Sequence, residues 1–170
     1  MALDVAGPAA DGPAPRAVDA ARRLRAAPAL GTDGTRRFDR LAQVARLVAR
    51  SPQPLYVRVS RGPAADRSTV SRDHESGCVL PGLSVNPLSP EPWWDRPLEH
   101  WIARQLFQYA HLADDESFAW LLTGEVSGRG PDCEPLLVAV RPVAVLDVAV
   151  LDEARDVYER VFDDDDRGEG

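Results

Sequence analysis

Lysine is absent from the 170 residues, so all 20 basic side chains are arginine. Isoleucine and methionine occur once each, whereas alanine, valine, proline and aspartate are frequent. This usage is typical of a GC-rich genome such as that of an actinobacterium. Because arginine is the only cation that the chain uses, a single arginine carries little functional information by itself.

Other absences exclude whole classes of protein. Two cysteines are too few for a disulfide framework. No apolar run approaches the roughly 20 residues that a membrane-spanning helix needs. Residues 1–15 have neither the basic opening nor the apolar segment of a signal peptide. We therefore expect a cytoplasmic protein with reduced thiols and no membrane contact.

The charge is acidic overall and uneven along the chain. The 27 acidic residues give a net charge of −7, which disfavours binding to duplex DNA. Residues 1–50 are net basic and residues 51–162 are net acidic. The basic region could pair with the acidic body or meet an anionic partner. A solvated helix face is the simpler interpretation.

Composition divides the chain into three parts. Residues 1–34 are rich in alanine, glycine and proline and hold few large apolar side chains, so we expect a disordered arm. Residues 163–170 form an acidic tail that should also be disordered. A single domain is expected over residues 35–162.

Hydrophobic periodicity predicts the elements of this domain. Five apolar side chains from Phe38 to Val48 share one helical face, and two prolines follow at Pro52 and Pro54. The expected elements are a helix ending before Pro52, strands over 55–60 and 78–83, a helix over 98–112, strands over 118–126, 135–141 and 143–148, and a helix over 151–162. This order predicts an α+β domain with a mixed or antiparallel sheet and N-terminal, central and C-terminal helices.

No strong catalytic signature is present, and the acidic and sulfur-bearing residues form only a weak cluster. Residues 73–75 and Cys78 could hold a metal, with Asp132 or Cys133 as further ligands. A polar turn with a lone histidine explains the same residues more simply. Cys133 beside a histidine could act as a nucleophile, although a small buried cysteine is the commoner case.

A proline-rich loop over residues 90–97 holds the adjacent pair Trp93 and Trp94. Adjacent aromatic rings on a stiff loop can wall a ligand pocket or stack on a base. More often such rings cover a hydrophobic core.

Three polar residues that are far apart in sequence form the most informative set. Arg58 lies in a strand opposite the apolar face, where its guanidinium could hold a phosphate or carboxylate. Ser84 directly follows the second expected strand, and Glu134 lies between a turn and Pro135. Alternatively, Arg58 faces water and Glu134 caps a turn.

Four motifs resemble an uncharacterised actinobacterial family that is carried under a domain-of-unknown-function label. They are SRDHESG at 71–77, LPGLSVNPL at 80–88, PWW at 92–94 and GRGPDCEP at 128–135. The resemblance covers about residues 40–162 and implies no assigned activity.

The order of an arginine in a strand, a serine-bearing strand, a long helix and a glutamate before a strand resembles ADP-ribosyltransferase-like domains. That resemblance implies that Arg58 or Arg61 holds the phosphates of NAD and that Ser84 supports the nicotinamide ribose. It implies that Glu134 binds a ribose hydroxyl and stabilises an oxocarbenium-like transition state. The serine motif lacks the Ser-Thr-Ser form, and Asp132 stands where glutamine or glutamate is usual.

Two hypotheses follow. In the first, the protein is an ADP-ribosyltransferase-like domain that binds or acts on NAD or another nucleotide, with Trp93 and Trp94 as further binding residues. In the second, it is a non-enzymatic module that binds a protein partner through its tryptophan loop and basic arm. The first requires Arg58, Ser84 and Glu134 to line one cleft.

Overall fold

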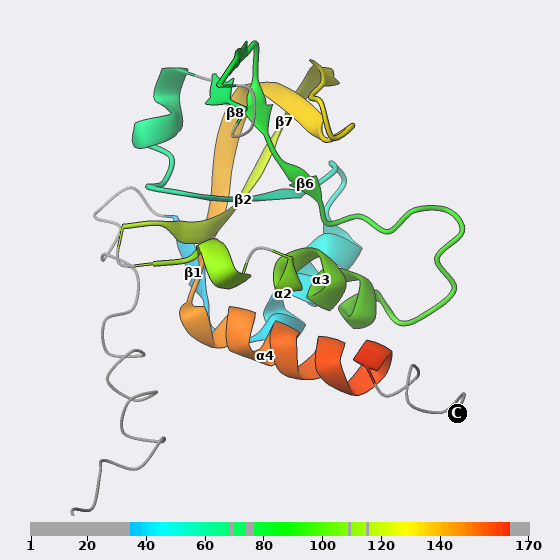
Figure 1. Ribbon diagram of the computed structural model, residues 1–170. Helices are drawn as coiled ribbons and strands as arrows, with labels where there is room; N and C mark the ends of the chain where they lie inside the picture. Colours follow the sequence, from blue (N-terminus) through cyan, green and yellow to red (C-terminus); the bar gives the residue numbers. More distant parts are fainter. Residues whose placement is uncertain (1–34, 69, 74–76, 109, 115, 164–170) are drawn as a thin grey trace, which may run out of the picture.

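The computed structural model describes residues 35–68, 70–73, 77–108, 110–114 and 116–163 (Figure 1). The predicted disordered arm, residues 1–34, and nearly all of the predicted acidic tail lie outside these residues.

Helices and strands follow one another in the order expected of an α+β protein. The helices are α2 (Leu41–Arg50), α3 (Leu98–Phe107) and α4 (Val148–Tyr158), with short 3-10 turns at Ala65–Ser68 and Ala110–Leu112 and a π-turn at Glu159–Asp163. The strands are β1 (Arg36–Phe38), β2 (Tyr56–Ser60), β3 (Ser71–Arg72), β4 (Val79–Leu80), β5 (Leu83–Ser84), β6 (Asn86–Pro87), β7 (Phe118–Arg129) and β8 (Pro135–Leu146). The α+β class predicted from the sequence is confirmed.

The main sheet is mixed, with the strand order β1-β8-β7-β2-β6. Strands β7 and β8 form a long antiparallel hairpin at its centre, and β1 joins its edge in parallel to the end of β8. Three register shifts interrupt the hairpin, and Ala139 adopts a positive φ of 50° near one of them. Such bulges bend and twist a ribbon, which allows the sheet to curl.

Residues 83–87 close the curled sheet on itself. Strand β5 pairs antiparallel with β8, and β6 pairs antiparallel with β2, with Val85 alone between them. The pairings therefore run in a circuit from β2 through β7 and β8 and back to β2. The residues enclosed within this circuit are Tyr56, Leu83, Val85, Phe118, Trp120, Leu122, Leu137 and Val145.

The other face of the sheet is covered by the three helices, which Figure 1 shows together on one side of the strands. Leu55 and Val57 point toward this layer, as does Leu121 from β7. Trp101, Ile102 and Leu106 from α3 pack against them and are all buried. Because β7 is buried on both faces, its first five residues form a continuous apolar run rather than an alternating one.

Several boundaries differ from the sequence predictions, among them the strand expected over 78–83, which is divided into β4 and β5 with Pro81 and Gly82 between them. Phe38 belongs to a strand, because the exposed edge of β8 needs backbone partners and the segment before α2 supplies them. The predicted break at Pro142 is wrong: β8 continues through a bulge to Leu146 and α4 begins at Val148. The central helix ends at Phe107, short of residue 112, and β7 extends into the predicted turn as far as Arg129.

Among the described residues, no helix is long and apolar enough to cross a membrane.

Candidate functional site

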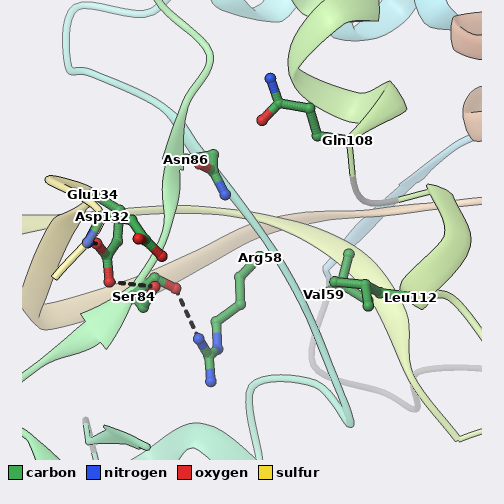
Figure 2. Close-up of a pocket in the computed structure, with 8 residues that line it drawn as sticks. All are labelled: Arg58, Val59, Ser84, Asn86, Gln108, Leu112, Asp132 and Glu134. Carbon is green, nitrogen blue, oxygen red and sulfur yellow. Dashed lines mark hydrogen bonds between the residues drawn. The ribbon is translucent and has the colours of Figure 1, made fainter. Parts of the chain in front are cut away.

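A cleft of about 420 Å³ opens beside β2 and the closing segment, at the tip of the β7–β8 hairpin (Figure 2). The lining residues are Arg58, Val59, Ser84, Asn86, Gln108, Leu112, Asp132 and Glu134. They come from β2, from residues 83–87, from the segment that follows α3 and from the hairpin loop. Arg58, Ser84 and Glu134 thus line one cleft.

The backbone of Ser84 is held on both sides. Its N–H donates to the hydroxyl of the buried Ser71 at 2.9 Å, and its carbonyl accepts from Nη1 of Arg58 at 2.7 Å. Its hydroxyl donates to Oε1 of Glu134 over 3.3 Å, a long hydrogen bond. The hydroxyl is therefore positioned toward the carboxylate but weakly engaged by it.

The hairpin loop fixes the carboxylate of Glu134. The N–H of Gly130 donates to the backbone carbonyl of Glu134 at 2.9 Å, and Cys133 adopts a positive φ of 63° in the turn between them. The N–H of Asp132 donates to Oε2 at 3.0 Å. Each carboxylate oxygen thus has one donor and retains room for a further one.

Arg58 is engaged mainly by protein groups. Its Nε and Nη2 donate to the two oxygens of Asp66 at 2.8 and 3.2 Å, in a largely buried pair with 18% and 11% of the two side chains exposed. The hydroxyl of Ser60 also donates to Asp66, at 2.5 Å, and accepts from the indole N–H of Trp120. Asp66 therefore occupies the edge of the Arg58 guanidinium that could otherwise bind a phosphate through two hydrogen bonds.

The charge balance of the cleft follows from this pairing. Asp66 neutralises Arg58, so the carboxylates of Asp132 and Glu134 leave the lining net negative. Such a lining disfavours a phosphate and suits a neutral or cationic group rich in hydroxyls and amides. Asn86 and Gln108 add amide donors and acceptors to the same lining.

Three other predicted binding residues are not among those that line the cleft. Arg61 forms an ion pair with Glu116, with both side chains mostly exposed. Trp94 packs against the helical core, and Trp93 packs edge-on against Trp94 and Trp101 with 65% of its surface exposed. The structure does not bring these three side chains to Ser84 and Glu134.

The predicted metal cluster is only partly described, because residues 74–76 lie outside the described part of the chain. Within the described residues, no group of three or more histidine, cysteine, aspartate or glutamate side chains could hold a metal ion. Cys78 and Cys133 are both exposed and form no disulfide. Cys133 is thus not the small buried cysteine that the sequence favours.

Sequence reasoning did not assign binding roles to Asn86, Gln108 or Leu112. Asn86 follows Ser84 by two residues, and Asp132 precedes Glu134 by two. Side chains two residues apart in an extended chain point to the same face, so this spacing could have indicated that each pair lies together. No local pattern links Gln108 or Leu112 to the cleft, because they reach it through the packing of α3 against the sheet.

The fold and the site together define an α+β domain that has a polar, net acidic cleft at the tip of its central hairpin. A family of unknown function, DUF6098, matches residues 31–169, and the chain belongs to this family. No curated protein and no solved structure matches the chain.

Proposed function

We propose that the cleft binds the nicotinamide-ribose part of NAD and that the domain is ADP-ribosyltransferase-like. The observation that carries the proposal is the convergence of Arg58, Ser84 and Glu134, from three distant parts of the chain, on one cleft. The arginine-only composition supports the actinobacterial origin that we predict for the protein.

The proposed role of Glu134 is electrostatic. Its carboxylate would accept a hydrogen bond from a ribose hydroxyl in place of the long bond from Ser84. In the reaction, the bond between the ribose and nicotinamide breaks, and nicotinamide leaves as a neutral molecule with the bonding electron pair. Positive charge develops on the ribose, and a fixed carboxylate nearby stabilises it. Water or an acceptor hydroxyl then bonds to the ribose carbon and releases its proton.

The proposed role of Arg58 is positional. It donates to the carbonyl of Ser84 and is paired with Asp66, so it orders the serine-bearing strand. The net negative lining also favours the cationic nicotinamide ring of NAD over a neutral ring.

The test compares wild type with Glu134→Gln, which keeps the shape of the side chain and removes its charge. Nicotinamide release from NAD should fall by roughly a hundredfold or more, which corresponds to about 3 kcal/mol of lost transition-state stabilisation. The matched control is Glu125→Gln, because Glu125 is exposed on the same hairpin and does not line the cleft. Equal activity in all three proteins would contradict the role of Glu134.

A wild-type protein that neither binds nor consumes NAD or nicotinamide riboside would overturn the proposal. The second candidate function is then binding to a protein partner through the tryptophan loop. The large exposed fraction of Trp93, on a loop anchored by Trp94, favours that function. If so, Trp93→Ala should abolish partner binding and leave the melting temperature nearly unchanged.

A further inference from the structure

A second cavity adjoins the cleft. It has a volume of about 410 Å³ and is lined by Phe107, Gln108, Ala110, His111 and Arg155. Gln108 lines both cavities, and the 3-10 turn Ala110–Leu112 divides them. Residues 110 and 111 of this turn line the second cavity and Leu112 lines the first, so the two cavities share Gln108 and one short turn.

The two cavities differ in charge. The first contains two carboxylates and an arginine that is already neutralised, whereas the second contains Arg155 and His111 without a lining carboxylate. The side chain of Arg155 donates from Nη2 to Asp152 at 2.5 Å, and 41% of this side chain is exposed. A half-exposed pair of this kind contributes little stability, so a phosphate can replace Asp152 at low cost.

The walls of the second cavity also suit part of a nucleotide. The ring of Phe107 stacks on Tyr158 with 4.0 Å between centroids and an interplanar angle of 3°, which fixes it as a flat apolar wall beside Ala110. An apolar wall with a few convergent polar groups is typical of small-molecule sites.

We propose that the second cavity binds the phosphate-bearing part of the same ligand, so that the full site takes a phosphorylated nucleoside whose ribosyl end lies at Glu134. This inference rests on the proposed function and deepens it. It assigns phosphate recognition to Arg155 and His111, in place of Arg58.

The test is a calorimetric titration of the full chain with nicotinamide riboside, which lacks phosphate, and with NAD. Wild type should bind NAD at least about tenfold more tightly than the riboside. Arg155→Gln should lose that gain for NAD and keep its affinity for the riboside. Arg160→Gln is the matched control, because Arg160 is exposed in the π-turn that follows α4 and is not among the residues that line the cavity.

The outcomes separate the two proposals. If the riboside binds but the Arg155 variant retains the full preference for NAD, the second cavity has no phosphate role and the proposed function stands. If the variant loses affinity for both ligands equally, Arg155 acts on the fold or the first cleft, and the inference is wrong. If wild type binds neither ligand, both proposals are overturned.

Discussion

Gly130 lies where the carboxylate of Glu134 leaves no space for a side chain. A Cβ atom at this position would lie 1.9 Å from Oε1 and 2.3 Å from the carboxyl carbon. The carboxylate is the end of a flexible side chain, so it would rotate away and leave the backbone in place. A single methyl group can therefore move the charge of the site without removing it.

We predict that Gly130→Ala weakens binding of nicotinamide riboside at least about tenfold, because the carboxylate leaves its donors on Ser84 and Asp132. The loss of these two hydrogen bonds, one partly buried and one exposed, should lower the free energy of unfolding by about 1 kcal/mol. Gly128→Ala is the control, since nothing lies within 4 Å of the added Cβ. Titration and urea denaturation of both variants measure the two effects, and identical titrations would contradict the prediction.

Arg58 and Arg61 are close in sequence but lie in different kinds of ion pair. The pair of Arg58 with Asp66 is largely buried, whereas the pair of Arg61 with Glu116 is exposed. Arg58→Met leaves the Asp66 carboxylate without its cationic partner and the Ser84 carbonyl without the guanidinium donor, so it should cost about 3 kcal/mol of unfolding free energy. Arg61→Met should cost less than about 1 kcal/mol. Urea denaturation curves distinguish the two, and similar small losses would show that the Asp66 pair does not stabilise the fold.

At the scale of elements, the sequence predicted the helices and strands whose apolar residues recur with a clear period. Residues 55–60 alternate as expected: Leu55 and Val57 contact the helical core, while Tyr56 faces the enclosed side of the sheet. The closing segment 83–87 could not be predicted, because strands of two residues have no period and their partners are distant in sequence. Arg58, Ser84 and Glu134 were predicted to line one cleft from their residue types and their order in the chain. The position of Gln108 in the same cleft depends on tertiary packing alone.

The buried face of α3 provides a test at this scale. Leu106 is fully buried in the core between the helices and the sheet, so Leu106→Ala should lower the free energy of unfolding by about 2–5 kcal/mol. Leu112→Ala, at a residue with 47% of its surface exposed, should lower it by less than about 1 kcal/mol. Thermal and urea unfolding measure both, and an unchanged melting temperature for the Leu106 variant would refute this assignment of the core. The apolar stripe of the helix expected over 98–112 also predicts that Tyr109 packs inward, but this residue lies outside the described part of the chain.

At the scale of the whole molecule, the described domain begins at its first strand. Strand β1 pairs with the end of β8, and the carbonyl of Phe38 accepts from the N–H of Asp147 at the start of α4. The match to the family also begins before this strand, at residue 31. This edge of the sheet thus joins the first described strand to the last one.

We predict that removal of residues 1–30 changes the free energy of unfolding by less than about 0.5 kcal/mol, since every described element is retained. Removal of residues 1–39 deletes β1 and should destabilise the domain by several times as much, because β8 then loses its parallel partner. Urea denaturation of both truncated proteins provides the measurement. If the protein that lacks residues 1–30 unfolds less cooperatively than the full chain, the arm packs on the domain.

The pairing of β1 with β8 also has a consequence for biosynthesis. Arg36 is paired with Ala144, so nearly the whole described chain lies between the two partners (Figure 1). A ribosome releases β1 early and β8 late, and the edge of the sheet cannot form until the second partner has left the exit tunnel. Contacts between such distant segments slow folding, because a long loop must close before they form. The nascent domain therefore completes its sheet only after almost all of its sequence has been translated.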